Sequence, residues 1–362
     1  MQICEEEAKR MSNRINSRMA IVDLWKFLAA VMIMIHHLYY LSPAFEGKDY
    51  PGYFGWIYVE FFFILTGYFT YRHFTRSDRQ ENIVRSSLSY TWHKFKPFLP
   101  YTTIAVTLQY LLSAPYTALM QGSYRKFIYS FADYPLELML LGEAHVSKQR
   151  LVPIWFLSAM LIIFPLVGLL SQLKNKYLTL LISGLCPLFY YGRVQLGNRV
   201  WPDDLLRAAA GLLLGVFLCV LSDLIREKQL IPQSKAMTKL LTAIEIMCML
   251  LAFLFIIRAD KSLWRVIILL FAAGLSIMLS GRSMTAKLQS PVIAYLGKLS
   301  MPMFIWQWVV ATAVIRLGQL VPLPTAVSVG LYFVGTFLVS AVSYHIVGAF
   351  GKKRENKCRK TT

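Results

Sequence analysis

The chain has 362 residues, of which 56% are hydrophobic and 16% are charged, and its mean hydropathy is +0.50. Soluble domains are about a quarter charged and do not place long apolar runs end to end. The composition therefore excludes a water-soluble enzyme and a disordered chain. The net charge of +19 would suggest a nucleic acid partner in a soluble protein. In a polytopic membrane protein it reflects basic cytoplasmic loops, so no nucleic acid partner is expected.

Apolar windows of about twenty residues, the length that crosses a bilayer as a helix, recur along the chain. All should be helices, because unpaired backbone groups in lipid are very costly. The sequence thus predicts an all-α polytopic membrane protein with about ten transmembrane helices. The predicted spans are 20–40, 52–72, 97–115, 152–171, 177–192, 203–222, 238–257, 263–281, 299–319 and 324–348.

The distribution of Lys and Arg predicts the orientation in the membrane. With the N-terminus inside, the inside segments hold more than twice as many basic residues as the outside loops, which places both termini in the cytoplasm. We therefore expect a cytoplasmic segment 1–19, one membrane-embedded domain 20–350, and a basic cytoplasmic tail 351–362 in a multi-pass protein of the plasma (inner) membrane. The run after residue 19 lacks a small-residue cleavage site, which predicts a signal anchor.

The longest outside connection, 116–151, contains an amphipathic stretch that is expected to lie on or dip into the outer surface. Its apolar residues are Phe127, Ile128, Phe131, Leu136, Leu138, Leu140 and Leu141.

The cysteines and the known catalytic motifs exclude several chemistries. The five cysteines form no C-x-x-C and no ligand spacing with the six histidines, so neither a metal site nor a disulfide framework is expected. Walker, G-x-G-x-x-G, H-E-x-x-H and G-x-S-x-G motifs are absent from the sequence, which argues against nucleotide hydrolysis, metalloprotease and esterase activity.

Ionisable residues inside spans are functional candidates because they are costly in lipid. The first span carries Asp23, Lys26, His36 and His37. On a helix, Lys26 and His37 differ by about 20° in azimuth and about 16 Å along the axis, whereas His36 points away from that face. His37 is therefore the candidate catalytic base, and Asp23 and Lys26 can pair at i, i+3. The alternative is a neutralising Asp23–Lys26 pair and an interface histidine.

The second span carries Glu60, with no basic residue inside its own run. A partner from another helix is needed, and His37 is the economical one, since a carboxylate orients an imidazole. The alternative is a glutamate that reaches the outer interface. We expect Gly67 to let helices approach closely.

A basic segment follows the second span and includes Arg72, Lys94 and Lys96. Positive-inside bias and anionic lipid alone would explain it. The functional alternative is a site for a phosphorylated cytosolic ligand, in which these residues contact phosphates.

The order and spacing of these residues resemble the acyltransferase-3 family of membrane O-acyltransferases, which modify cell-surface sugars. The first span resembles the family's pattern through Val22, Asp23, Lys26 and His37, with Lys where the family has Arg. Further similar positions are Glu60, Phe61, Phe62, Thr66, Gly67, Tyr68 and Arg72, the loop to Lys94, Lys96, Pro97 and Pro100, the run Trp155-Phe156-Leu157, Arg207 with Gly211 and Gly215, and Leu296, Gly297, Ser300, Phe304 and Ile305. Gln307 stands where many members have histidine.

The resemblance implies transfer of an acyl group, acetyl from acetyl-CoA, to a hydroxyl of a cell-surface or lipid-linked saccharide. His37 would act as base or carry the acyl group, with Glu60 and Asp23 beside it, and Lys26, Arg72, Lys94 and Lys96 would hold the donor, a substrate rather than a bound cofactor. The implied partners are acyl-CoA, the saccharide and membrane lipid. Two alternatives remain: a transporter or flippase of lipid-linked sugars, for which inverted repeats and broken helices would be expected, and a non-catalytic scaffold of the same fold.

Overall fold

The protein is described by a computed structural model. The residues that this structure describes are 20–46, 50–76, 82–121, 125, 128–129, 131–144, 150–197, 203–232, 234–258, 262–280 and 290–361. The predicted cytoplasmic segment 1–19, Phe127 of the amphipathic stretch and the side chains of the predicted tail 351–362 lie outside this description.

The described residues form helices joined by loops, with no strand among them. The α-helices are α2 (Ala20–His36), α3 (Leu38–Leu41), α4 (Val59–Arg76), α5 (Ile83–Phe95), α6 (Leu99–Gln121), α8 (Tyr134–Leu138), α9 (Ile154–Leu170), α10 (Lys176–Gln195), α11 (Asp203–Glu227), α12 (Lys235–Ile257), α13 (Leu263–Leu279), α14 (Pro291–Leu320) and α15 (Thr325–Thr361). Short 3₁₀ helices are η1 (Pro43–Phe45), η2 (Tyr53–Tyr58) and η3 (Gly142–Ala144).

A helix lies over each range that the sequence predicts as a span. Among the described residues, five helices are long and apolar enough to cross a membrane: Ala20–Leu41, Asp203–Glu227, Lys235–Ile257, Pro291–Leu320 and Thr325–Ala349. Two shorter helices, Ile154–Leu170 and Leu263–Leu279, are also apolar. The described part of the chain is thus an all-helical multi-pass arrangement, while the count of ten spans and the location of the termini stay predictions.

Polar residues fix where several helices begin. The side chains of Asn82, Asn175, Ser234 and Ser290 each accept a hydrogen bond from a backbone N–H of the following first turn. These caps satisfy donors that have no partner within the helix.

Several helix boundaries differ from the predicted ranges; for example, α6 extends to Gln121 and not to 115, and α14 begins at Pro291 and not at 299. The predicted second span begins at residue 52, but 53–58 forms η2 and the α-helix begins at Val59. The basic segment after it is not only a loop, because most of it forms α5, which packs against α9. Hydropathy missed α5 because this helix lacks a continuous apolar run.

Glycines bring α4 and α11 into backbone contact. A Cβ on Gly67 would lie 1.9 Å from the Leu212 carbonyl oxygen, and one on Gly215 would lie 2.0 Å from that of Ile64. Any side chain at either position would force the helices apart. The predicted close approach at Gly67 is therefore confirmed, and it leaves no space between these two helices at this level.

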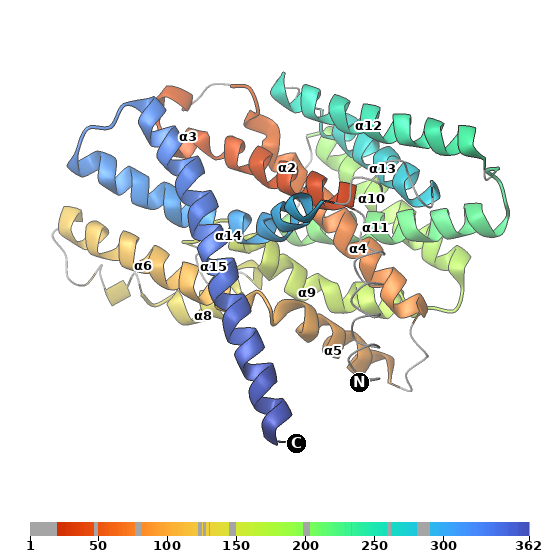
Figure 1. Ribbon diagram of the computed structural model, residues 1–362, viewed down its shortest axis with the longest axis horizontal. Helices are drawn as coiled ribbons and strands as arrows, with labels where there is room; N and C mark the ends of the chain where they lie inside the picture. The colour runs from red at the N-terminus through yellow and green to blue at the C-terminus, as the bar shows by residue number, and fades with distance from the viewer. Residues whose placement is uncertain are drawn as a thin grey trace.

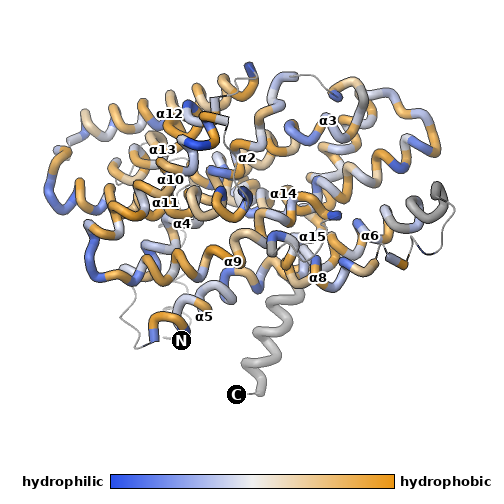
Figure 2. Tube along the Cα trace, turned by 180° about the vertical axis from the view of Figure 1, so that it is seen from behind, coloured by the Kyte–Doolittle hydropathy of each residue, from blue (hydrophilic) through white to orange (hydrophobic). Residues whose placement is uncertain are grey.

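The main helices run side by side, and α15 crosses them obliquely in Figure 1. Figure 2 shows that hydrophobic residues follow the helices along their length, whereas hydrophilic ones gather mostly in the connections. Large apolar side chains such as Leu181, Leu185 and Leu188 of α10 are exposed. This pattern is expected of helices whose outer surface faces lipid.

The described residues 131–144 of the connection 116–151 are anchored to the bundle. Leu140 is buried in the main core, and Phe131 and Leu138 pack against that core. The buried carboxylate of Glu137 accepts hydrogen bonds from the backbone N–H groups of Arg150 and Leu151. Phe131, Leu138 and Leu140 therefore pack on the helices and Glu137 holds the residues just before α9, whereas Ile128 of the same stretch is exposed.

Candidate active site

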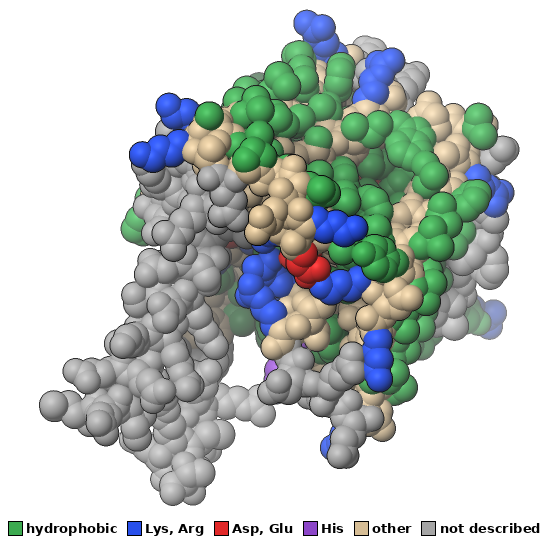
Figure 3. Space-filling model, turned by 90° about the vertical axis from the view of Figure 1, so that its right-hand side faces the viewer, with side chains coloured by type: hydrophobic (Ala, Val, Ile, Leu, Met, Phe, Trp, Pro, Cys, Tyr) green, Lys and Arg blue, Asp and Glu red, His purple; other side chains and the backbone are tan. Residues whose placement is uncertain are grey.

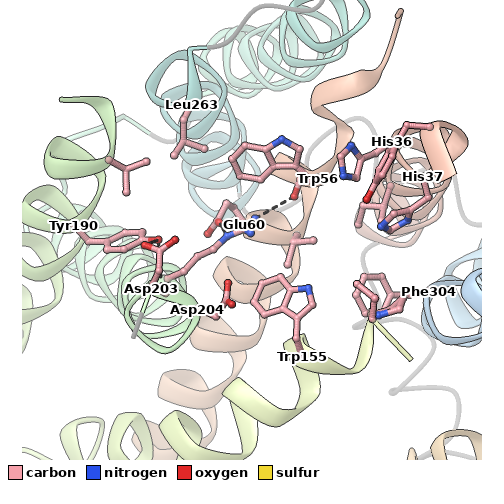
Figure 4. A pocket seen from close by; sticks show the side chains of 17 residues that line it. His36, His37, Trp56, Glu60, Trp155, Tyr190, Asp203, Asp204, Leu263 and Phe304 are labelled. Carbon is pink, nitrogen blue, oxygen red and sulfur yellow. Dashed lines mark hydrogen bonds and ion pairs between the residues drawn. The ribbon is translucent and has the colours of Figure 1, made fainter. Parts of the chain in front are cut away.

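A cavity of about 330 Å³ lies among several helix ends, and we call it the histidine pocket (Figure 4). It is lined by Ile33, His36, His37, Tyr39, Trp56, Val59, Glu60, Val152, Pro153, Trp155, Tyr190, Val194, Asp203, Asp204, Arg207, Leu263 and Phe304. The C-terminal ends of α2 and α10 meet the N-terminal ends of α4, α9, α11 and α13 here. This alternation places the pocket toward one end of an antiparallel bundle.

Two histidines line one side of the pocket. Helix α2 ends at His36, and His37 lies in the turn before α3, with its ring centroid 4.9 Å from that of His36. His36 Nδ1 donates to the Tyr53 carbonyl oxygen, which can only accept, so its Nε2 keeps a lone pair. His37 Nδ1 lies 3.2 Å from Gln307 Oε1. Both imidazoles border the cavity, so the preference for His37 over His36 stays a prediction.

Glu60 also lines the pocket, but its partner is not His37. The carboxylate is 0% exposed, it pairs with Arg207 Nε, and it accepts a hydrogen bond of 2.6 Å from the Tyr191 hydroxyl. Both oxygens therefore have partners on α10 and α11. The prediction that Glu60 pairs with His37 is wrong in this structure, and so is its alternative, a glutamate that reaches the interface.

Arg207 is fixed between two indoles. Its guanidinium carbon lies 4.7 Å from the ring centroid of Trp56 and 5.0 Å from that of Trp155, and its Nη2 donates to the Trp56 carbonyl oxygen at 3.1 Å. In Figure 4 these tryptophans separate the histidines from a group of polar side chains, namely Tyr190, Asp203 and Asp204. The pocket therefore presents imidazoles on one side of the tryptophans and carboxylates with a tyrosine hydroxyl on the other.

Sequence reasoning did not pair Glu60 with Arg207. The available signal was that both carry opposite charges inside predicted spans, although Asp203 and Asp204, at i−4 and i−3 from Arg207, were the nearer partners in the sequence. Nothing in the sequence singled out Tyr191, Trp56 or the aspartates.

Asp23 and Lys26 lie away from the pocket. Lys26 Nζ is 2.7 Å from Asp23 Oδ1, which confirms the predicted i, i+3 pair. Asp23 packs against α14, where a Cβ on Gly297 would lie 2.4 Å from the Asp23 Cβ. Neither residue lines the histidine pocket. The structure therefore brings together His37 and Glu60, but not Asp23 or Lys26, at this cavity.

A second cavity of about 670 Å³, here called the basic pocket, lies at the other ends of the same helices. It is formed at the C-terminal ends of α4, α9 and α11 and the N-terminal ends of α5 and α10. Its charged and imidazole-bearing lining residues are Arg72, His73, Arg76, Lys174, Lys176, Asp223, Arg226 and Glu227. Figure 3 faces this end of the bundle and shows Lys and Arg side chains around an acidic one.

The predicted donor residues are distributed unevenly around this second cavity. Arg72 lines it, and its Nη1 donates to the Tyr68 hydroxyl at 2.7 Å. Lys94 and Lys96 do not line it. They lie at the far end of α5, whose first turns border the cavity, and Lys94 Nζ is 5.2 Å from the centroid of the Tyr90 ring. The structure thus groups Arg72 with Arg76 of the same predicted basic segment, and with three basic residues that the sequence had not pointed to, namely Lys174, Lys176 and Arg226.

Comparison with known proteins identifies the family. No curated protein and no solved structure matches the chain. The acyltransferase-3 family, described as an acyltransferase domain, matches residues 19–345. Because this match covers most of the chain, and because the described helices are those of a membrane protein, the protein belongs to the acyltransferase-3 family of membrane acyltransferases.

Proposed function

We propose that the protein is a multi-pass O-acyltransferase of the plasma (inner) membrane. It transfers an acyl group, acetyl from acetyl-CoA, to a hydroxyl of a cell-surface or lipid-linked saccharide. The observation that carries this proposal is the pair of cavities at opposite ends of one helix bundle, one lined by histidines and one by basic residues. A donor from one side and an acceptor from the other would each have a chemically suited site.

The histidine pocket is the proposed acceptor and reaction site. Nε2 of His37 takes the proton from a saccharide hydroxyl, and the oxygen attacks the thioester carbonyl carbon. The carbon–sulfur bond then breaks, and the proton passes from the imidazolium to the leaving thiolate. The products are the O-acyl saccharide and free CoA. A hydroxyl is a poor nucleophile at neutral pH, which is why such a base is needed.

The basic pocket is the proposed donor site. Its five Lys and Arg side chains face two carboxylates, and one of these, Glu227, pairs with Lys176. The remaining positive charge suits the phosphates of a CoA-type donor. Lys94 and Lys96 would extend this site along α5. With the predicted orientation this pocket is cytoplasmic, where acyl-CoA is available, and the histidine pocket faces outward.

The acyl arm must cross the distance between the two pockets. Glu60 and Arg72 are twelve residues apart on α4, which corresponds to about 18 Å. Because α4 and α11 touch at Gly67 and Gly215, the arm passes beside these helices and not between them. Lys26, on the half of α2 directed away from the histidine pocket, is the proposed group that stabilises donor charge along this route, with Asp23 holding it in place.

The test uses purified protein with radiolabelled acetyl-CoA and candidate glycans. We expect label in the glycan, its loss in His37→Gln, and much of the activity in His36→Gln. Absence of transfer to every acceptor class, from acetyl-CoA and longer acyl-CoA donors alike, would contradict the proposed function. Equal activity of the two variants would remove the assignment of His37 alone.

A further inference from the structure

The buried surroundings of His37 contain a hydrogen-bond chain that fixes the positions of its ring protons. His37 is 9% exposed, and both Gln307 of α14 and Tyr332 of α15 are 0% exposed. Gln307 Nε2 donates to the Phe304 carbonyl oxygen at 3.1 Å. Gln307 Oε1 faces His37 Nδ1 at 3.2 Å and the Tyr332 hydroxyl at 3.3 Å.

The Phe304 carbonyl determines which way the Gln307 amide points. A carbonyl oxygen only accepts, so the NH₂ group must face it. In the reversed amide two oxygens would oppose each other in a buried site, which is costly. Gln307 Oε1 is therefore directed at His37, and because this oxygen also only accepts, the proton lies on His37 Nδ1.

We propose that Gln307 is a positioning residue that holds His37 as the Nδ1–H tautomer, with the Nε2 lone pair available as the base. This inference rests on the proposed function for its catalytic consequence. The ring orientation has further support, since His37 packs edge-on against Trp308 at 5.2 Å between centroids. The amide thus does for His37 what a carboxylate does in other histidine-dependent sites: it selects one tautomer.

The tautomer of His36 does not depend on Gln307, because His36 Nδ1 donates to the backbone oxygen of Tyr53. A change at Gln307 therefore perturbs one histidine and leaves the other in place. Because of this difference, one experiment can test the tautomer of His37 and also identify which histidine is the general base.

The test compares wild type with Gln307→Met, which keeps the length of the side chain but removes the amide. Ring ¹⁵N spectra of histidine-labelled protein distinguish protonated from unprotonated nitrogens, and a His37→Gln sample assigns the His37 signals. We expect only Nδ1–H in wild type and a mixture of tautomers in Gln307→Met. We also expect kcat to fall about 10- to 100-fold, which corresponds to a competent Nδ1–H tautomer populated at about 10% to 1% in the variant, with donor and acceptor KM little changed. Losing a general base altogether would have a larger effect, about 10²–10⁴-fold.

Two variants separate this role from folding. Gln307→Glu, as the neutral acid, donates its O–H to the Phe304 carbonyl oxygen and keeps its other oxygen toward Nδ1, so it should recover most of the kcat lost in Gln307→Met. Gln109→Met removes another buried glutamine, one that donates to Thr312 on the same helix α14, and should leave kcat unchanged.

An unchanged tautomer in Gln307→Met, or a mixed tautomer with unchanged kcat, would overturn the proposal. The second result would assign the base to His36. If wild type transfers no acyl group, the proposed function fails, while the ¹⁵N spectra still decide whether Gln307 fixes the tautomer.

Discussion

The ion pair between Glu60 and Arg207 should be among the most consequential interactions in the bundle. Its side chains are 0% and 13% exposed, and Arg207 also donates to the Trp56 carbonyl and lies between two indoles. Removing one partner of such a pair leaves an uncompensated buried charge and costs about 3–5 kcal/mol. Each aromatic contact contributes about 0.5–2 kcal/mol more. Arg207→Met should therefore destabilise the protein by at least about 3 kcal/mol.

The chain supplies a matched control in Lys176 and Glu227, a pair whose side chains are 46% and 53% exposed. Exposed pairs contribute about 0–1 kcal/mol, so Lys176→Met should have little effect. Unfolding in detergent by denaturant measures both variants, and Glu60→Gln/Arg207→Met should recover part of the stability lost in Arg207→Met. Equal stability of Arg207→Met and Lys176→Met would refute the reasoning. So would a double variant that is no more stable than Arg207→Met.

Three further predictions follow from the charges. Lys26→Arg should retain acyl transfer, at least in part, and Lys26→Met should lose it; full activity in the Met variant would reduce Lys26 to a structural partner of Asp23. A reporter that is active only outside the cytoplasm should stay silent when fused at Thr362, and a signal would mean an odd number of spans. Arg72→Gln should raise the donor KM about 10- to 100-fold, because one charge-assisted hydrogen bond contributes about 1.5–3 kcal/mol. An increase confined to Lys94→Gln or Lys96→Gln in place of Arg72→Gln would move the donor from the basic pocket to α5.

Local patterns in the sequence determine where the helices of this protein form. A helix in lipid satisfies its own backbone and needs only a sufficient apolar run, so a window of residues determines where α2, α11 or α14 can exist. The Asp23–Lys26 pair was predictable for the same reason, since i, i+3 neighbours meet on any helix. The small residue at Gly67 likewise pointed to close packing, although not to α11 as the partner.

The tertiary structure alone decided which groups on different helices meet. Glu60 pairs with Arg207, 147 residues away, and not with His37, because α4 packs on α11 along their glycines. His37 meets Gln307 because the turn after α2 lies against α14. Hydropathy and helical periodicity describe one helix at a time. They state which face carries a charge, but the identity of the neighbouring helix depends on packing of the whole bundle, and that packing assembled the histidine pocket from six helix ends.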